Sequence, residues 1–290
     1  MISAWKAWVL ASRPKTLPAA IVPVWSGCLL AWHLTGNFDL RLAVVTVLGA
    51  ICIQIATNFF NDVIDAEKGA DTSARIGPQR ATSGGFLSPR AVYAGAVIML
   101  LLAVVCGFLL YQIRGWAILA IGIPSLYLSY GYTGGPMPLA YRGLGEVFVI
   151  LFFGLVAVMG TIFVQTGAWP WQGLILGLQI GLLSAVLIAV NNYRDLEEDR
   201  VSNKRTLVVR WGRRPVVFLI YGMTALPALL VPVYGGSQCW FGVSLALAAI
   251  FLAAEFFLIK PDGVSSKLLG LSALHLLLFV VGQNLCLSLT

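Results

Sequence analysis

Residues 42–65 read LAVVTVLGAICIQIATNFFNDVID. Residues 42–61 of this stretch carry no charge. About twenty residues of α-helix span roughly 30 Å, which is the thickness of the hydrocarbon core of a bilayer. Asp62 and Asp65 follow at once. The stretch therefore predicts a membrane-spanning helix that ends in a cluster of acidic side chains.

Composition extends this interpretation to the whole chain. Of its 290 residues, 59% are hydrophobic and 11% are charged, and the mean hydropathy is +0.88. A soluble domain carries about 25% charged residues. We expect an all-α, polytopic membrane protein in which a single domain, residues 1–290, holds nine transmembrane helices. The apolar runs that predict them lie at about 17–35, 42–61, 91–112, 115–133, 145–166, 172–193, 215–235, 239–259 and 268–288.

The basic residues predict how these helices are oriented. With the N-terminus in the cytoplasm, seventeen of the nineteen Lys and Arg residues fall on the cytoplasmic side, and only Arg41 and Arg114 fall on the other side. Membrane proteins favour this distribution, which also explains the net charge of +7 without a nucleic-acid partner. The long loops, at about 62–90, 134–144 and 194–214, then form a cytoplasmic cap. We expect a multi-pass protein of the bacterial inner (plasma) membrane, in contact with its lipids.

Two smaller features complete this survey. Trp5 and Trp8 are three residues apart, so they share a helix face. We therefore expect residues 1–15 to form an interfacial segment that lies on the membrane. The cysteines have no metal-ligand spacing and all fall in apolar runs, so we interpret them as small buried apolar residues. They are Cys28, Cys52, Cys106, Cys239 and Cys286.

A second acidic cluster resembles the first. Asn191-Asn192-Tyr193-Arg194-Asp195 follows the apolar run at 172–193, as Asn61-Asp62-Val63-Ile64-Asp65 follows its own. Each cluster is succeeded by basic residues and a threonine, Arg80-Ala81-Thr82 in one case and Lys204-Arg205-Thr206 in the other. Four expected spans separate the clusters. An even number of crossings returns the chain to the same side, so both clusters can face one cavity.

Helical spacing selects the residues within each cluster. Asn58, Asp62 and Asp65 share one helix face, and Asn192, Asp195 and Asp199 share another. Facing carboxylates repel, by about 4 kcal/mol at 4 Å and an effective dielectric near 20. Oxygen ligands without His or Cys favour a hard cation such as Mg²⁺, which commonly binds through carboxylates and substrate phosphates together. The basic residues that follow can then bind phosphate oxygens directly. They are Arg75, Arg80, Lys204 and Arg205.

These motifs resemble the UbiA superfamily of intramembrane aromatic prenyltransferases, which carries two Asp-rich motifs at the cytoplasmic ends of the second and sixth of nine helices. Within it, the chain is most similar to the 1,4-dihydroxy-2-naphthoate polyprenyltransferases of menaquinone synthesis. The resemblance rests on Arg13 to Pro18, Asn61 to Asp71, Tyr132 to Glu146 and Asn191 to Arg210. The superfamily pattern has a third carboxylate where this chain has Gly69. Whether Asp71 fills that metal position is left open.

The resemblance implies a UbiA-like helix bundle around a central cavity that opens to the cytoplasmic side. It also implies a Mg²⁺-dependent transfer of a polyprenyl chain from its diphosphate to 1,4-dihydroxy-2-naphthoate, with release of diphosphate and CO₂ to give a demethylmenaquinone. Asp62, Asp65, Asp195 and Asp199 would be catalytic. The metal ligands would be Asn61, Asp62, Asp65, Asp71, Asn192, Asp195 and Asp199. The diphosphate would bind at Asn58, Lys68, Arg75, Arg80, Lys204 and Arg205.

For the aromatic acceptor, the resemblance implies a site formed by Arg13, Lys15, Tyr130, Tyr132, Arg142 and Glu146. Two of these assignments have equal alternatives. Arg13 and Lys15 also fit as positive-inside anchors, and Glu146 also fits as an ion pair with Arg142 four residues before it. The acceptor itself has alternatives, 4-hydroxybenzoate or homogentisate. A divalent cation transporter that uses the same carboxylates is the alternative from another class.

Overall fold

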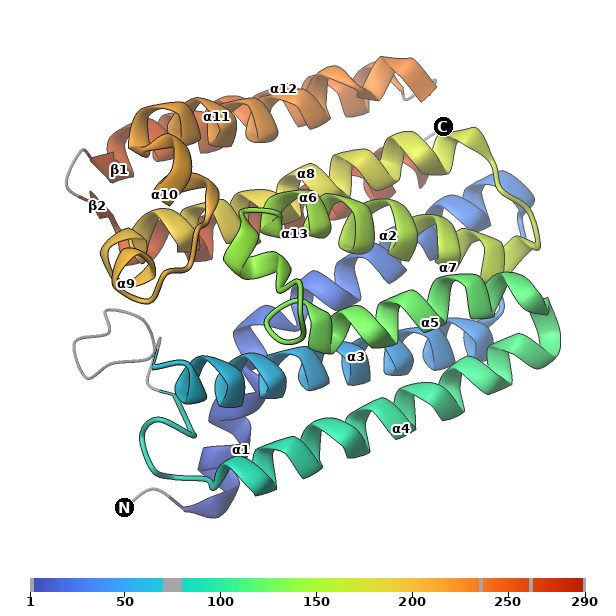
Figure 1. The fold of residues 1–290 in the computed structure, drawn as a ribbon. Coiled ribbons are helices and arrows are strands. Elements are labelled where there is room, and N and C mark those ends of the chain that lie inside the picture. The colour runs from blue at the N-terminus through green and yellow to red at the C-terminus, as the bar shows by residue number, and fades with distance from the viewer. Residues whose placement is uncertain (1–2, 70–79, 235–236, 261–262, 289–290) are drawn as a thin grey trace. The chain divides into compact units, whose positions relative to one another are not determined.

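The computed structural model describes residues 3–69, 80–234, 237–260 and 263–288. Within these ranges the chain is helical apart from a two-stranded antiparallel hairpin, β1 (Ile259–Lys260) and β2 (Gly263–Val264). It forms two compact units (Figure 1). The first unit comprises Met1–Ile21, Leu40–Gly145 and Asp195–Thr206, and the second comprises Val22–Asp39, Glu146–Arg194 and Leu207–Thr290.

The first unit is built on three long helices that follow one another along the chain. These are α3 (Leu40–Glu67), α4 (Pro89–Arg114) and α5 (Trp116–Gly131), which lie side by side (Figure 1). Shorter elements complete the unit. They are α1 (Ala4–Ser12), η1 (Pro14–Thr16), η2 (Leu139–Arg142) and α9 (Leu196–Val201).

Helix α1 packs against α3, and this changes the interpretation of its tryptophans. Trp5 is exposed, as an interfacial anchor would be. The ring of Trp8 instead contacts that of Phe59 edge-on, with centroids 5.4 Å apart. A Cβ at Gly95 would lie 2.7 Å from the Trp8 ring, so α4 also closes on it. Protein therefore covers part of the Trp8 ring, and the membrane location of residues 1–15 stays a prediction.

The second unit surrounds α8 (Trp171–Arg194), which contributes Leu176, Ile180 and Leu183 to its apolar core. One apolar stretch packs along α8 as α6 (Gly145–Val149), the π-helical η3 (Ile150–Val156) and α7 (Ala157–Thr166). The other elements are α10 (Leu207–Trp211), α11 (Arg213–Leu229), η4 (Val231–Tyr234), α12 (Gln238–Leu258), α13 (Ser266–Ser288) and the two strands. Helix α2 (Pro18–Thr35) begins in the first unit and continues in the second.

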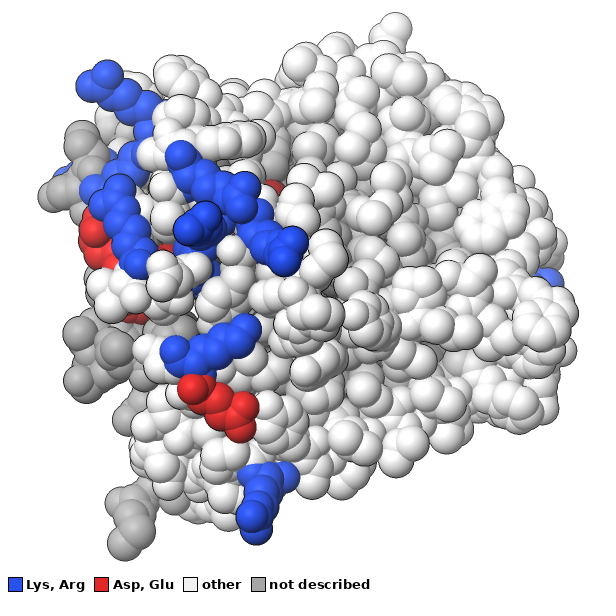
Figure 2. All heavy atoms as spheres, in the orientation of Figure 1, with Lys and Arg blue, Asp and Glu red and all other residues white. Residues whose placement is uncertain are grey.

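The spans agree closely with the sequence prediction. In the part of the chain that the structure describes, eight helical stretches are long and apolar enough to cross a membrane. The ninth expected span is the 16-residue helix α5, which contains Pro124. Figure 2 shows wide areas of uncharged side chains on the face drawn, with few Lys, Arg, Asp or Glu side chains among them. These features define an integral, multi-pass membrane protein.

The two acidic clusters end their helices differently. Helix α3 continues past the predicted boundary at residue 61 to Glu67, and Gly69, with φ of +67°, ends it in a left-handed turn. Helix α8, in contrast, ends at Arg194. Asp195 then starts the short helix α9, and its carbonyl accepts a hydrogen bond from the Asp199 N–H at 2.9 Å. The expected continuous helix through Asp199 is therefore wrong, because Asp favours helix starts over helix interiors.

Close backbone contact between η3 and α8 generates a first prediction. A Cβ at Gly154 would lie 2.3 Å from the Gly177 carbonyl oxygen and 2.6 Å from the Gly181 Cα, both of which are backbone atoms that cannot rotate away. We expect Gly154→Ala to lower the stability by about 1–3 kcal/mol, as overpacking does. The thermal midpoint in detergent measures this effect.

Gly222→Ala is the matched control, because Gly222 also lies in a helix of the second unit but nothing stands within 4 Å of its Cβ position. There the substitution is expected to leave the midpoint unchanged or to raise it, since Ala favours a helix over Gly by about 1 kcal/mol. Equal midpoints for the two variants would contradict the tight contact.

Candidate functional site

The first acidic cluster lies in the last two turns of α3, where both aspartates are buried and hydrogen-bonded. Asp62 accepts backbone hydrogen bonds from Ala81 N at 3.1 Å and Thr82 N at 2.8 Å. Asp65 accepts a side-chain hydrogen bond from Arg80 Nη2 at 3.3 Å, and both side chains of this ion pair are buried. The basic residue and threonine that follow the first motif in sequence thus return to it in space.

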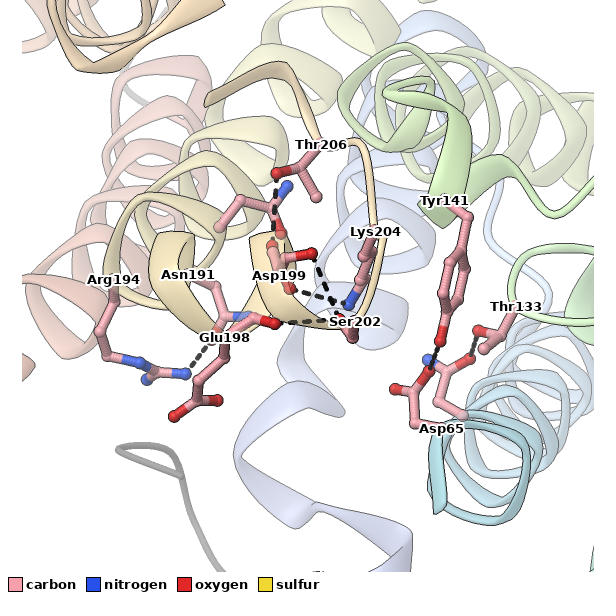
Figure 3. A network of polar contacts seen from close by, with 12 residues as sticks. Asp65, Thr133, Tyr141, Asn191, Arg194, Glu198, Asp199, Ser202, Lys204 and Thr206 are labelled. Carbon is pink, nitrogen blue, oxygen red and sulfur yellow. Dashed lines mark hydrogen bonds and ion pairs between the residues drawn. The ribbon is translucent and has the colours of Figure 1, made fainter. Parts of the chain in front are cut away.

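Tyr141 of η2 connects this cluster to the second one. Its hydroxyl donates to Asp65 Oδ1 at 2.9 Å. Its ring lies 4.0 Å from Lys68 Nζ and 5.9 Å from Lys204 Nζ, and its carbonyl accepts from Arg205 N at 3.2 Å. Figure 3 shows Asp65, Tyr141 and Lys204 facing the same space. One aromatic ring therefore contacts a lysine from each of the two motifs.

The second acidic cluster is held by the loop after α9. Asp199 is buried, with Lys204 Nζ 3.7 Å from Oδ1 and the Thr206 hydroxyl donating to Oδ2 at 3.3 Å (Figure 3). The Lys204 N–H also donates to the Asp199 carbonyl at 2.8 Å. Burial raises the pKa of Asp199 to about 6; Lys204 opposes this rise, while Asp195 and Asp65 add to it. The carboxylates of the two motifs are therefore close enough to repel one another electrostatically.

Burial and neighbouring charges shift the pKa values of the titratable groups at the Tyr141 ring. Burial lowers the pKa of Lys68, and the nearby charge of Lys204 lowers it further, while Asp65 opposes both effects. Burial and the adjacent Asp65 raise the pKa of the Tyr141 hydroxyl well above its usual value. The tyrosine is thus a neutral hydrogen-bond donor near pH 7. The two ammonium groups repel each other and would be stabilised by an anion between them.

Lys68 is positioned by a further contact with the 133–141 segment. Its ammonium donates to the Thr133 carbonyl oxygen at 2.8 Å. The Thr133 hydroxyl donates to Asn61 Oδ1, one of the expected metal ligands. The segment between α5 and η2 therefore contacts the end of α3 at both Asn61 and Lys68.

The oxygen-rich donor set has the chemistry that Mg²⁺ prefers, since this ion commonly takes one or two carboxylates together with substrate phosphates. Asp65, Asp195 and Asp199 are all buried in the first unit. Within the described ranges, no three His, Cys, Asp or Glu side chains form a cluster that could hold the ion by themselves. Asp71 and Arg75, two of the expected site residues, lie outside the described residues.

Other expected site residues have structural contacts. Asn58 donates to the Ser12 carbonyl at 2.8 Å and to the Thr16 hydroxyl at 3.0 Å, and so ties the N-terminal segment to α3. That segment contains Arg13, whose φ of +50° is unusual for a residue other than glycine, and the exposed Lys15. Asn58 therefore fixes the backbone that carries the two basic residues expected at the acceptor.

The remaining candidates fall in both units. Glu146, in the second unit, is 3% exposed and accepts from Asn192 Nδ2 at 2.9 Å, while its other carboxylate oxygen has no hydrogen-bond partner. In the first unit, Arg142 donates to the Pro136 carbonyl at 3.5 Å, and the Tyr130 ring packs edge-on against Phe60 with centroids 5.4 Å apart. The Tyr132 carbonyl accepts from Ala140 N at 2.8 Å. Glu146 is thus hydrogen-bonded by an asparagine of the second acidic motif.

Sequence reasoning missed Tyr141 as a site residue. It lies 76 positions from Asp65, and no helical or strand period relates positions so far apart. A signal was nonetheless present, because Tyr141 begins the Tyr-Arg-Gly-Leu-Gly-Glu segment on which the family resemblance partly rests.

The spanning helices and the buried acid–lysine cluster together define an integral membrane protein with a charged site in its first unit. The chain belongs to the UbiA prenyltransferase family, which it matches over residues 20–276, and is therefore a prenyltransferase. It is 34% identical to a 1,4-dihydroxy-2-naphthoate octaprenyltransferase of Mycobacterium tuberculosis, over 87% of this chain and 86% of that protein. A protein of the same name from Escherichia coli is 35% identical, over 73% and 70%.

The solved structures show the same fold. A UbiA homolog from Archaeoglobus fulgidus, bound to GPP and Mg²⁺, has a TM-score of 0.72 at 16% identity, with 97% of this chain and 99% of that chain covered. The resemblance inferred from the Asp-rich motifs is thus confirmed at the level of family and fold. The roles of the individual site residues stay predictions.

The contacts of Tyr141 generate a second prediction. Tyr141→Phe removes the hydroxyl that positions Asp65 but keeps the ring beside Lys68 and Lys204. Groups that orient a metal-binding carboxylate typically contribute 10–100-fold to metal affinity or activity. We expect a loss of about tenfold in turnover and weaker binding of Mn²⁺, used as a spectroscopic substitute for Mg²⁺ and followed by electron paramagnetic resonance.

Tyr127→Phe is the control, because Tyr127 is an exposed residue of α5. It should leave both turnover and Mn²⁺ binding at their original values. Unchanged Mn²⁺ binding and unchanged turnover in Tyr141→Phe would show that the hydroxyl does not position Asp65 for the site.

Proposed function

We propose that this prenyltransferase transfers a polyprenyl chain from polyprenyl diphosphate to 1,4-dihydroxy-2-naphthoate. The single observation that carries this proposal is the gathering of Asp65, Asp199, Lys68 and Lys204 around Tyr141. It supplies carboxylates for a metal and ammonium groups for a diphosphate within one site. The acceptor is inferred from the names of the relatives at 34–35% identity.

The reaction breaks the bond between the first carbon of the prenyl chain and a diphosphate oxygen. A carbon–carbon bond forms at the naphthoate ring, and the ring carboxyl leaves as CO₂, so that the reduced, quinol form of a demethylmenaquinone results. Mg²⁺ bound by aspartates of both motifs would neutralise the charge that grows on the departing diphosphate. Asn61, Asp71 and Asn192 complete the ligand set that we propose.

The chain's own groups have distinct tasks in this scheme. Lys68 and Lys204 donate to the diphosphate oxygens, and Arg75 and Arg205 complete the proposed diphosphate site. Asn58 supports the site without donating to the diphosphate, because its amide hydrogens are donated to Ser12 and Thr16. Arg80 holds Asp65 in place. The neutral Tyr141 hydroxyl donates to Asp65 and so keeps this carboxylate oriented. Because Tyr141 keeps its own proton, it does not compete with Asp65 for the metal ion. The apolar helix surfaces exclude water from the allylic cation that forms as the diphosphate departs.

The acceptor side is proposed on chemical grounds. Arg13 and Lys15 suit the naphthoate carboxylate, and Arg142, Tyr130 and Tyr132 suit its ring and hydroxyls. Glu146 has one carboxylate oxygen that is buried without a hydrogen-bond partner. A buried acceptor of this kind favours a hydroxyl donor, so we assign the acceptor's hydroxyl to it.

The membrane location of the protein is inferred from the family as well. We propose that residues 1–290 act as one catalytic domain in a bacterial plasma membrane, with the N-terminus and the three long loops on the cytoplasmic side. There the loops at about 62–90, 134–144 and 194–214 would cap a cavity open to water-soluble acceptor and metal.

An assay of the purified protein tests the proposed acceptor. It supplies Mg²⁺, farnesyl diphosphate and, in parallel reactions, 1,4-dihydroxy-2-naphthoate, 4-hydroxybenzoate or homogentisate. We expect a prenylated, decarboxylated product from the naphthoate only, identified by its mass, and no product when a chelator removes the metal. Prenylation of one of the other acceptors in preference to the naphthoate would overturn the assignment.

Substitutions in the second motif test the metal assignment. Asp195→Asn and Asp199→Asn keep the side-chain shape but remove the negative charge, so we expect turnover to fall at least about 100-fold, with Mn²⁺ binding lost in parallel. Glu197→Gln is the matched control, because Glu197 is an exposed carboxylate of the same short helix and pairs with Arg200 at 3.2 Å. Near-normal turnover in both aspartate variants would exclude these residues as metal ligands.

A further inference from the structure

The last helical hairpin of the second unit has two differently built ends. At one end, β1 and β2 join α12 to α13, with Lys260 in β1 and Lys267 in the first turn of α13. At the other end, Cys239 and Cys286 bring their Sγ atoms within 3.3 Å of each other. Both are free thiols, Cys239 exposed and Cys286 buried. The expectation that every cysteine is simply a buried apolar residue is therefore wrong for Cys239.

The packing of the two helices holds the thiols together. Phe279, Gly282 and Cys286 are spaced three and four residues apart, so they lie on one face of α13. The Trp240 ring packs against Phe279 with centroids 4.8 Å apart, and a Cβ at Gly282 would lie 2.7 Å from the same ring. Because Cys239 precedes Trp240 directly, this ring contact fixes the approach of the two sulfurs.

The position of the pair along the membrane normal follows from charge. Helix α12 has 21 residues, a length of about 30 Å, so its two ends reach opposite surfaces of a bilayer. The end with Lys260 and Lys267 is the basic one, and basic ends favour the cytoplasm. Cys239 and Cys286 then lie at the outer surface, where extracytoplasmic compartments are oxidising and disulfides persist.

Local chemistry also favours reaction at Cys239. It lies in the first turn of α12. The side chain is exposed, so an oxidant can reach it. A disulfide needs the sulfurs to close from the observed 3.3 Å to roughly 2.05 Å.

We propose that Cys239 and Cys286 are a modification site that forms an intramolecular disulfide, closing the outer end of the α12–α13 hairpin. The Cys239 thiolate attacks a disulfide of low molecular mass or of a partner oxidoreductase, and the Cys286 thiolate then displaces the leaving thiol. The two cysteine S–H bonds are lost and one S–S bond forms. The partner disulfide takes up two electrons and two protons and becomes two thiols. This proposal does not depend on the identity of the acceptor.

Thiol counting on the full-length protein tests the proposal. The purified protein is equilibrated with excess oxidised glutathione or with a reductant, denatured in detergent and labelled with a maleimide of high mass. The chain has five cysteines, so we expect three labels after oxidation and five after reduction. Protein isolated from membranes in the presence of a thiol-blocking reagent, and then reduced and labelled, should carry two labels, because only the bonded pair escapes the block. Five labels after glutathione treatment would overturn the proposal.

Single substitutions identify the bonded pair. Cys286→Ser should lose at most one label on oxidation, because Cys239 can then only retain glutathione as a mixed disulfide, whereas Cys28→Ser, the control, should still lose two labels. A loss of two labels in Cys286→Ser would mean that another pair reacts, and would overturn the assignment. We also expect oxidation to raise the thermal midpoint of the unsubstituted protein but not that of Cys239→Ser, since a cross-link restricts the unfolded chain.

Discussion

A carboxylate buried at the end of a membrane helix is stable only if hydrogen-bond donors replace the water it has lost. Asp65 is 4% exposed and receives donors from Arg80 and Tyr141. The first donor holds Arg80 at the end of α3. The second fixes η2, and with it the ring beside Lys68 and Lys204. The satisfaction of one buried charge thus holds both Arg80 and η2 at the end of α3.

The same principle explains the balance of charge in the first unit. Asp62 is satisfied by two backbone N–H groups, Asp65 by an arginine and a tyrosine, and Asp199 by a lysine and a threonine. Lys68 donates to the Thr133 carbonyl oxygen and lies over the Tyr141 ring. Because Lys68 and Lys204 approach one ring from two motifs, the site combines concentrated negative charge with concentrated positive charge. A metal ion and a diphosphate together complement such a site, whereas either alone would meet repulsion.

Much of the fold could be predicted from the sequence, because a long uncharged stretch has few alternatives to a spanning helix. Spacing also placed Asp62 and Asp65 on one helix, as α3 has them. Residue spacing could not predict contacts between segments that are distant in sequence. The Trp8 ring contacts α3 and α4, and the Tyr141 hydroxyl of η2 donates to Asp65. The break at Asp195 was not predicted, because an acidic run is compatible with one continuous helix or with two shorter ones.

The π-helical segment η3 has a consequence for the residues on either side of it. A π-turn holds about one residue more than an α-turn, and one residue corresponds to a rotation of about 100°. A helical wheel drawn for residues 145–166 with about 3.6 residues in every turn would therefore place Glu146 on the wrong side of the helix relative to α7. The widened turn itself packs against α8 at Gly154, while Glu146, which precedes it, accepts a hydrogen bond from Asn192 of the same helix.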